Sequence, residues 1–419
     1  MNSLKGKKIL ILGGNRLSCD IVYIAKKMGL YTIVTDWNSP EASPAKLIAD
    51  ESWNISLLDY NSLLIKIKGE DVDGILTGFT DSYLIPYAKL CKLSNLPSYA
   101  TEELFEKTIN KSLFKEMCRK HNLPVVPEYE VSSFNPNIIS RDNKVIIKPV
   151  DNSGSRGIVI CDNPSSFQEC LNYSISYSKS QKVIIERYIE YDAISVSYTI
   201  QDGIPSLSTM NDDYLYKTPN FGAVNCGGIY PSKYLNHYLS FIDRKVKQML
   251  IKEGFKNGVL FMQAFTNGQE LFFFEMGYRL SGGRHYIFTE NQNKLSSIKQ
   301  LIYFAITGKM SNSIISKIDT PKFKNICFRL NLIGNQGKIY RIVGIERLSD
   351  IKEIINYSVL KREGEEVGKP GTTATQLLGA YIVANNKERI RSIVDFIYSN
   401  VSFLDVHGNN LVVKSHNFI

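Results

Sequence analysis

The hydrophobic positions fall into short runs whose spacing changes along the chain. Near the N-terminus the apolar runs KILILGG, YTIVTDWN and DGILTG alternate with polar segments, and an amphipathic helix is expected over residues 18–28. This alternation of strands and helices predicts parallel strands in a doubly wound sheet. We therefore expect a Rossmann-like α/β domain over residues 1–101, ending in the polar stretch 97–101.

The pattern changes in the middle of the chain. Residues 102–123 form a charged amphipathic helical region that Pro124 and Pro127 end. Strand-like runs then come in pairs: KVIIKPV with GIVICD, KVIIERYIE with AISVSYTI, and GVLFMQAF with LFFFEMG, the last pair joined by an Asn-Gly turn at 267 and 268. These pairs predict an antiparallel α+β domain over residues 102–310.

The last part of the chain, residues 311–419, predicts a small α+β domain. It begins with the strand ICFRLNLIG and continues to the strand LGAYIVA. A helix over residues 387–399 follows, and a final hairpin is expected across residues 407–410.

Composition and charge exclude several classes of protein. With 43% hydrophobic and 22% charged residues the chain is globular, and its apolar runs are shorter than the roughly 20 residues of a membrane-spanning helix. Seven scattered cysteines without a C-x-x-C pair indicate neither a disulfide framework nor a zinc site, which favours a reducing cytoplasm. The net charge of +9 is spread without a dense basic block, so we expect no nucleic-acid partner and no membrane partner.

Three segments carry the candidate chemistry. Between two strands, KPVDNSGSRG places Lys148 before a loop of small residues whose backbone amides can approach phosphate, although an ordinary glycine hairpin loop reads the same way. In VIIERYIE, Glu186 ends an apolar strand, where it is either an acceptor for an exocyclic amine or a surface acid. In LFFFEMGYRLSGG, Glu275 and Arg279 follow an apolar strand, where they bind a metal and a phosphoryl group or form an internal ion pair.

Taken together and in this order, these segments resemble the ATP-grasp superfamily, and the resemblance extends over nearly the whole chain. It is similar to biotin carboxylase, to the large subunit of carbamoyl-phosphate synthase, and to purine-pathway and L-amino acid ligases. The resemblance implies a pre-ATP domain over 1–101, a grasp domain over 102–310 whose two subdomains clamp ATP, and a C-terminal domain over 311–419.

The resemblance assigns most of the site residues to the nucleotide. Lys111 matches the first ATP lysine and Lys148 the second, while Asp192 is a looser candidate for the ribose. The phosphate-covering loop includes Ser155 as a side-chain donor, and the adenine clamp is formed by Glu186 with backbone atoms of the residues after it. The nucleotide-binding residues implied are Lys111, Lys148, Ser153, Gly154, Ser155, Arg156, Gly157, Glu186, Arg187, Tyr188, Ile189 and Asp192.

The metal site departs from the family pattern. Glu275 matches the first acid of the E-x-N-x-R signature and Arg279 its arginine, but Gly277 replaces the asparagine. On the preceding strand Gln263 or Met262 stands in the region of the usual acid, with Glu270 in the turn as a distant alternative. The resemblance thus implies ATP with Mg²⁺ or Mn²⁺ on Glu275 and Gln263, and either one firmly held metal or weakened catalysis.

The implied activity is that of an ATP-dependent carboxylate-amine ligase. Lys148 and Arg279 are the expected catalytic residues: a carboxylate is activated as an acyl phosphate, an amine attacks it, and ADP and phosphate are released. Bicarbonate activation of the carboxylase or carbamoyl-phosphate type, and a nucleotide-binding protein with weakened catalysis, are the alternatives. Dimer formation stays open, and the substrates are small molecules.

Outside the grasp segments, two further groups are candidates. Gly13, Gly14 and Asp36 imitate part of a dinucleotide fingerprint, but the full G-x-G-x-x-G is absent. The resemblance to the ATP-grasp superfamily implies that this domain contributes to the acceptor-substrate side rather than to NAD binding, which makes Asn15 and Arg16 candidate substrate contacts. After the Gly-Gly pair, Arg284 contacts a substrate carboxylate or His285 accepts a proton, and His285 is equally well read as structural.

Overall fold

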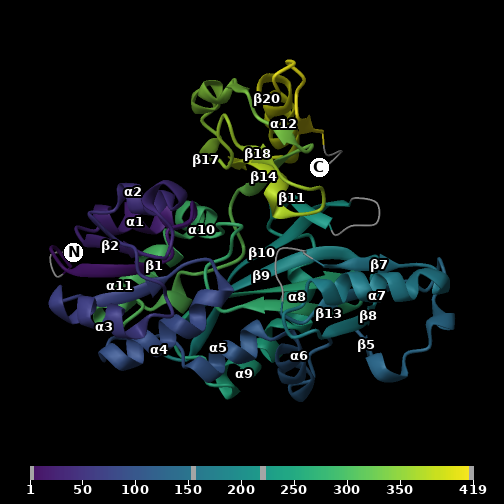
Figure 1. Cartoon of the computed structure of the whole chain (residues 1–419), viewed down its shortest axis with the longest axis horizontal. Coiled ribbons are helices and arrows are strands. Elements are labelled where there is room, and N and C mark those ends of the chain that lie inside the picture. Colours follow the sequence, from purple (N-terminus) through teal and green to yellow (C-terminus); the bar gives the residue numbers. More distant parts are fainter. Residues whose placement is uncertain (1–3, 152–156, 218–222, 415–419) are drawn as a thin grey trace.

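The N-terminal part of the chain is a parallel α/β unit. The computed structural model describes residues 4–151, 157–217 and 223–414, and Figure 1 shows this unit at one end of the molecule. Its parallel sheet has the order β3-β2-β1-β4, which confirms the predicted strand-helix alternation. Its elements are β1 (Lys8–Leu12), α1 (Ser18–Lys27), β2 (Tyr31–Thr35), η1 (Pro40–Ala42), α2 (Pro44–Ile48), β3 (Glu51–Trp53), α3 (Tyr60–Gly69), β4 (Gly74–Thr77), η2 (Asp81–Tyr83) and α4 (Leu84–Ser94).

The helical region that follows is divided in two. Its helices are α5 (Glu102–Ile109) and α6 (Lys111–Lys120). The division falls at Asn110, whose side-chain oxygen accepts the backbone N–H groups of Ser112 at 3.0 Å and Leu113 at 3.2 Å. This side chain caps the first turn of α6, and the cap fixes Lys111 as the first residue of that helix.

A small antiparallel sheet forms a separate lobe. Its strands lie in the order β5-β8-β6-β7, and α7 packs on β6 and β7. The predicted pairing of KVIIKPV with GIVICD is confirmed, but the pairing of KVIIERYIE with the next strand is wrong, because both edges of β8 are occupied by β5 and β6. The elements are β5 (Glu128–Tyr129), η3 (Val131–Ser133), η4 (Pro136–Ile138), β6 (Val145–Pro149), β7 (Val159–Cys161), η5 (Pro164–Ser166), α7 (Phe167–Ser176) and β8 (Val183–Arg187).

The large sheet crosses the middle of the molecule. Its order is β13-β12-β9-β10-β11-β14-β19-β17, with β21 paired to β14. The predicted hairpin of GVLFMQAF with LFFFEMG is confirmed as β12 and β13. The strands are β9 (Asp192–Gln201), β10 (Ile204–Lys217), β11 (Ala223–Tyr230), β12 (Gly258–Thr266), β13 (Leu271–Gly277), β14 (Ile326–Gly334), β17 (Ile354–Val359), β19 (Gln376–Ala384) and β21 (Val412–Val413).

Helices and short strands complete the second half of the chain. The predicted last turn is closed by a backbone hydrogen bond from Asp405 N–H to the Asn409 carbonyl at 2.9 Å, but the strands on either side, β20 and β21, pair with β16 and β14. The elements are α8 (Leu235–Phe241), α9 (Asp243–Lys252), α10 (Tyr286–Asn293), α11 (Ser297–Thr307), η6 (Ile315–Lys317), β15 (Gly337–Lys338), β16 (Arg341–Val343), η7 (Ile345–Asp350), β18 (Glu366–Val367), η8 (Thr373–Thr375), α12 (Lys387–Asn400) and β20 (Ser402–Leu404).

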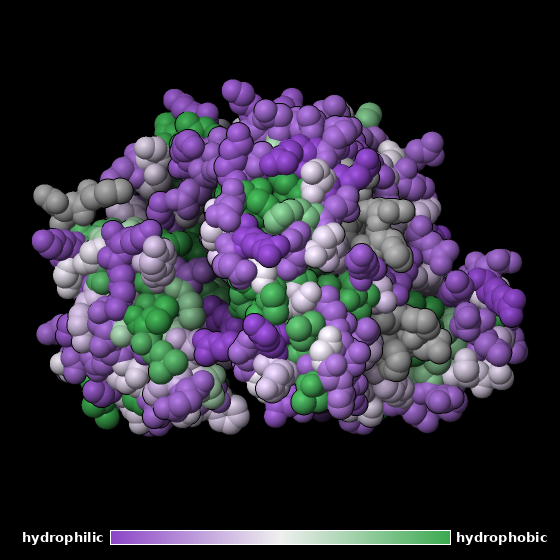
Figure 2. All heavy atoms as spheres, turned by 90° about the horizontal axis from the view of Figure 1, so that it is seen from above, coloured by the Kyte–Doolittle hydropathy of each residue, from purple (hydrophilic) through white to green (hydrophobic). Residues whose placement is uncertain are grey.

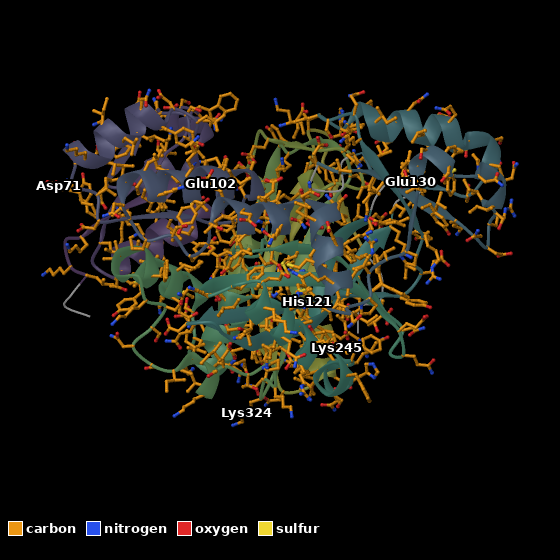
Figure 3. All side chains as sticks on the ribbon, turned by 90° about the horizontal axis from the view of Figure 1, so that it is seen from below. Asp71, Glu102, His121, Glu130, Lys245 and Lys324 are labelled. Carbon is orange, nitrogen blue, oxygen red and sulfur yellow. The ribbon has the colours of Figure 1, made fainter. Side chains whose placement is uncertain are left out.

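The hydrophobic cores show which parts of the chain pack together. One core joins the N-terminal sheet to α5, α6 and the strands β9, β12 and β13, whereas the small sheet has a core of its own. Figure 3 shows the N-terminal unit, where Asp71 is labelled, and the small lobe, where Glu130 is labelled, at opposite ends of the molecule. The small lobe is therefore joined to the rest without a shared core, as a clamp around a ligand requires.

The surface seen in Figure 2 is mostly hydrophilic, and the cysteines are free. Figure 2 shows a mostly hydrophilic face broken by small hydrophobic patches. Across the described ranges, no helix combines the length and the apolar character needed to cross a membrane. No disulfide joins any of the seven cysteines, all of which lie in described segments.

Candidate functional site

Charged side chains from both lobes meet between the small sheet and the large sheet. Lys148 comes from β6, Glu186 from β8 and Glu275 from β13, while Lys111 begins α6. Burial lowers the pKa of Lys111, and Lys148 adds to this lowering, whereas the negative charges of Glu275, Asp81 and Glu186 oppose it. Lys148 Nζ lies 2.6 Å from Glu186 Oε2 and 6.0 Å from the ring centroid of Phe274, the residue before Glu275, so the structure brings predicted residues of both lobes together.

The Glu186 carboxylate is held between two lysines. Its residue is 1% exposed, and Lys148 Nζ lies 2.6 Å from Oε2. The other oxygen, Oε1, pairs with Lys115 of α6, which the sequence analysis did not single out. Lys115 stands one helical turn after Lys111 among apolar residues, and this i, i+4 spacing was the signal that could have revealed it.

The segment after Glu186 presents backbone and aromatic groups. The Tyr188 N–H donates to the Lys144 carbonyl at 3.0 Å, whereas the Ile189 N–H has no acceptor among the residues described. On β12 and β13 the rings of Phe265 and Phe274 are stacked with centroids 4.5 Å apart, and the Phe274 ring centroid lies 6.0 Å from Lys148 Nζ. A buried carboxylate, an unused N–H and an aromatic floor are the groups that recognise a purine edge and face.

Two other nucleotide candidates are placed differently. Asp192, at the exposed start of β9, accepts from Lys233 Nζ at 2.7 Å and from Tyr234 at 2.6 Å. Burial raises the pKa of Asp192, but these two hydrogen bonds outweigh it and hold the pKa below its ordinary value. Arg187 points its guanidinium over the Phe272 ring at 5.4 Å rather than toward Glu186.

The phosphate-covering loop falls largely outside the described residues. Ser153, Gly154, Ser155 and Arg156 lie in the segment 152–156, so their placement stays a prediction. Gly157 is described and has a φ of +78°, a left-handed conformation that a residue with a Cβ rarely adopts. An added Cβ would also meet Tyr177 and Pro149, so glycine is needed where the chain leaves this loop.

The metal candidates Gln263 and Glu275 are direct partners across the β12–β13 pair. Gln263 donates its Nε2 to Ser195 Oγ at 3.3 Å, which leaves the amide oxygen Oε1 as the group for a cation. Within the described part of the chain, Glu275 has no hydrogen-bond or ion-pair partner, and no group of three His, Cys, Asp or Glu side chains could hold a metal. These two oxygen ligands fit a hard cation that takes its remaining ligands from nucleotide and water.

The other residues considered for the metal do not lie at this site. Met262 is fully buried and pairs with Met276 on the opposite face of the hairpin. Glu270 sits in the hairpin turn, where it accepts from the Tyr191 hydroxyl at 2.6 Å. Gln263 is therefore the residue that faces Glu275.

Gly277, in place of the family's asparagine, has a steric reason. A Cβ added at Gly277 would overlap the ring of Phe261, its partner on β12. Replacing Gly277 by asparagine should lower the free energy of unfolding by about 1–3 kcal/mol, because the added side chain overpacks this contact. Urea unfolding measures the loss, and Gly69→Asn, where an added Cβ meets nothing within 4 Å, is the control and should change stability by less than about 1 kcal/mol.

The same contact predicts a rescue. In a Phe261→Ala background the Gly277→Asn change should cost less than in the parent protein, since the ring that it meets is gone. Equal costs in both backgrounds would contradict the steric explanation.

Arg279 is fixed by the N-terminal unit. Its Nε and NH2 nitrogens each lie 2.6 Å from a carboxylate oxygen of Asp81, and its guanidinium stands 5.1 Å from the Phe261 ring centroid. Burial lowers the pKa of Arg279, but Asp81 outweighs burial and keeps the pKa raised. Among the described residues Arg279 pairs with Asp81 and not with Glu275, so the predicted internal ion pair is not formed. The bidentate contact with Asp81 fixes the orientation of the guanidinium.

A second buried polar cluster adjoins the Gln263 side of the site. Arg329 of β14 is 5% exposed, donates to Asn225 Oδ1 at 2.8 Å and pairs with Asp213 at 3.2 Å. Asp213 also accepts from Ser195 Oγ at 2.5 Å, which links the cluster to Gln263. Sequence reasoning missed Arg329, although an arginine within the apolar run ICFRLNLIG was a usable signal.

The Arg329 guanidinium packs against the Gly282-Gly283 loop. A Cβ at Gly283 would overlap Arg329 NH1, so this glycine allows the close approach. Among the described residues, the buried Nε of Arg329 has no hydrogen-bond acceptor. Such an unpaired buried donor is costly and marks a place where a polar ligand atom can bind.

Arg284 and His285, the candidates after the Gly-Gly loop, form hydrogen bonds and an ion pair within the protein. Burial, with a smaller effect of Arg329, lowers the pKa of His285 to about 3, so its imidazole is neutral and is held by hydroxyls of Ser197 and Ser281 at 3.1 Å. Arg284 pairs with Asp20 at 2.7 Å. These contacts favour the structural reading of His285.

The N-terminal candidates are engaged as well. Arg16 donates to the Val359 carbonyl at 2.8 Å, and Asn15 donates to Thr80 Oγ1 at 3.3 Å. Asp36, which imitated a dinucleotide fingerprint, accepts from Gly14 N–H at 2.8 Å and pairs with Lys46 at 2.9 Å. Asp36 thus stabilises the loop after β1 instead of being free to bind a ribose.

Part of the chain is similar to known proteins. Residues 108–271 match the model of the ATP-grasp domain. A formate-dependent phosphoribosylglycinamide formyltransferase of Sulfurisphaera tokodaii is 28% identical over 211 residues, covering 44% of this chain and 48% of that protein. The chain thus spans about half the length of this relative.

Two solved structures share the fold. An L-amino acid ligase from Bacillus licheniformis has a TM-score of 0.78 at 15% identity, covering 96% of this chain and 99% of its own. The biotin carboxylase domain of 2-oxoglutarate carboxylase from Hydrogenobacter thermophilus, solved with MgADP and bicarbonate, has a TM-score of 0.72 at 17% identity, covering 93% and 89%. The chain therefore carries an ATP-grasp domain in a mixed α/β ATP-grasp fold, as the order of its sequence motifs predicted.

Proposed function

We propose that this protein is an ATP-dependent ligase that activates a carboxylate as an acyl phosphate and couples it to an amine. The observation that carries the proposal is the convergence of Lys111, Lys148, Glu186 and Glu275 from two lobes with separate cores. Cations for phosphates, an acceptor for a base amine and a carboxylate for a metal are the parts that phosphoryl transfer from ATP needs.

The proposed organisation has three units. Residues 1–101 form the pre-ATP unit, 102–310 the two-lobed grasp domain and 311–419 the C-terminal unit. The separate core of the small sheet supports a clamp within 102–310, and a core formed mostly by residues after 325, together with Val224, Cys226 and Ile229 of β11, supports the last unit. We place the protein in the cytoplasm and keep a homodimer as part of the proposal, since the similar carboxylase domain was solved as a dimer.

In the proposed reaction, Lys111 and Lys148 bind the phosphates of ATP while Glu186 and the Ile189 N–H bind the adenine. Mg²⁺ or Mn²⁺ held by Glu275 and the Gln263 amide oxygen would supply charge neutralisation at the phosphate oxygens. A substrate carboxylate oxygen attacks the γ-phosphorus, the bond to the β-phosphate oxygen breaks, and ADP leaves. The amine then attacks the acyl carbon and releases phosphate, with Arg279 beside the developing oxyanion.

The second polar cluster is the proposed place for a substrate group. The unused Nε of Arg329 and the adjoining Gly282-Gly283 loop lie on the Ser195 and Gln263 side of the site. A carboxylate is the group that a buried guanidinium binds best. Because the relative in Sulfurisphaera is named for formate and phosphoribosylglycinamide, this pair is the first to test, followed by pairs of amino acids.

The test is a trap for the acyl phosphate. The protein, Mg-ATP and one carboxylate are incubated with hydroxylamine, which converts an acyl phosphate to a hydroxamate, and ADP is measured in parallel. Hydroxamate that forms only with ATP and an organic acid supports the ligase. ADP release with bicarbonate alone would instead favour the bicarbonate-activating alternative.

A nucleotide-binding protein with weakened catalysis is a second candidate, and a specific observation favours it. The Phe261 ring fills the space beside Gly277, and Gln263 replaces an acid, so one carboxylate faces the metal position. Tight ATP binding without ADP formation across acids and amines would support this candidate.

The charge of the metal site gives a separate prediction. Replacing Gln263 by glutamate should lower the Mg²⁺ concentration needed for half-maximal ATP binding or turnover by about tenfold, because a second carboxylate joins Glu275. A Mg²⁺ titration at fixed ATP measures the change. Gln269→Glu, the same change at an exposed position of the same hairpin turn, is the control, and an equal shift in both variants would contradict a site at Gln263.

A further inference from the structure

Lys115 and Lys148 bind different oxygens of the Glu186 carboxylate, but they differ in how many N–H donors remain for a ligand. Lys148 reaches Oε2 from β6, and in the described part of the chain Glu186 is its one ion-pair or hydrogen-bond partner. Lys115 reaches Oε1 from α6, and its side chain is 0% exposed. The two lysines therefore cannot have the same role.

All three N–H groups of Lys115 are used within the protein. Besides Glu186, its Nζ donates to Glu128 Oε1 at 2.9 Å and to the Val126 carbonyl at 3.4 Å. Glu128 is itself held by Arg119. Lys115 is thus anchored at three points with no donor left for a ligand, which excludes a direct contact with ATP.

Lys148, in contrast, has donors for phosphate, and using them weakens its hold on Glu186. A carboxylate that loses one of its two cations is held less firmly in its orientation. Glu186 must keep an oxygen turned toward the base if it is to accept an amine. Lys115, whose donors all stay within the protein, holds the carboxylate in that orientation.

We propose that Lys115 is a positioning residue for base selection, which fixes the orientation of the Glu186 carboxylate so that it accepts an exocyclic amine while Lys148 binds phosphate. The inference rests on the proposed nucleotide site. A base with a carbonyl oxygen in place of the amine would bind more weakly, because that oxygen and the carboxylate are both hydrogen-bond acceptors. Lys115 therefore sets the preference for adenine without touching it.

The experiment compares ATP with inosine triphosphate, which has a carbonyl oxygen in place of the amine. Dissociation constants of both, with Mg²⁺, are measured by calorimetry on the full chain. The parent protein should bind ATP at least about tenfold more tightly than inosine triphosphate, because the Glu186 carboxylate accepts from the amine of adenine and has no donor on the analogue. In Lys115→Met this ratio should fall by about tenfold, with inosine triphosphate binding changed by less than about threefold.

Three further variants separate positioning from damage to the fold. Lys120→Met, the same change on the same helix at a side chain that is 67% exposed, should leave the ratio unchanged. Lys115→Gln keeps a buried donor and should lower the ratio in the same direction, so it replaces Lys115→Met if that variant does not fold. In a Glu186→Gln background, Lys115→Met should not lower the ratio further, because its effect passes through Glu186.

The outcomes distinguish this inference from the proposed function. If the parent protein binds ATP selectively but Lys115→Met and Lys115→Gln weaken both nucleotides equally, Lys115 is merely structural and the inference is wrong while the site stands. If the parent binds neither nucleotide, the nucleotide site itself is wrong, and the inference is overturned with it.

Discussion

Replacing Lys148 by methionine should lower ATP turnover by about 10²–10³-fold or more while the protein stays folded. Lys148 lies near the end of β6, with its Nζ 2.6 Å from Glu186 Oε2 and 6.0 Å from the Phe274 ring centroid, and it is one of the two lysines proposed to bind the phosphates. Removing one preorganised electrostatic group from a phosphoryl-transfer site typically costs this much in rate. Methionine keeps the length and the apolar stem, so packing against Phe274 survives.

The measurement is ADP formation under the conditions of the hydroxamate test, with circular dichroism as the check on folding. Lys144→Met is the matched control: Lys144 directly precedes the same strand but pairs with Glu190 at 3.3 Å near the surface. Its rate should stay within about threefold of the parent. Full activity of Lys148→Met would sink the assignment of the nucleotide site.

The local elements could be predicted from the sequence because each depends on nearby residues. The parallel N-terminal strands, the β6–β7 pair and the Asn-Gly hairpin of β12 and β13 follow from periodicity and turn residues. The pairing of β8 with β9 failed because which strand fills an edge is decided by distant segments. Glu128 and Tyr129 of β5, more than fifty residues earlier, occupy the edge of β8 that the next strand was expected to take.

The candidate site shows the same division. Lys148, Glu186 and Glu275 stand in recognisable local motifs, and they could be found without knowing which strands are neighbours. Lys115 and Arg329 could not, because their roles depend on partners far along the chain: Lys115 meets Glu186 seventy-one residues later, and Arg329 meets Asp213 across the sheet. A buried lysine or arginine in an apolar run is a signal only when its partner can be named.

Replacing Asp213 by alanine should lower the free energy of unfolding by about 3–5 kcal/mol, because it leaves the Arg329 guanidinium buried without its carboxylate. The side chains of Arg329 and Asp213 are 6% and 4% exposed, and Asp213 also accepts from Asn211, Asn225 and Ser195. Urea unfolding followed by fluorescence measures the loss.

The control is Glu353→Ala, which breaks the pair with Arg389 at 2.9 Å, whose side chain is 47% exposed. Surface pairs of this kind contribute about 0–1 kcal/mol, so the two variants should differ by at least about 2 kcal/mol. An Arg329→Met change made together with Asp213→Ala should recover part of the loss, since the unpaired charge is removed as well. If the double variant is less stable than Asp213→Ala alone, the charge of Arg329 is not what makes the single change costly, and its packing against Gly283 carries the larger share.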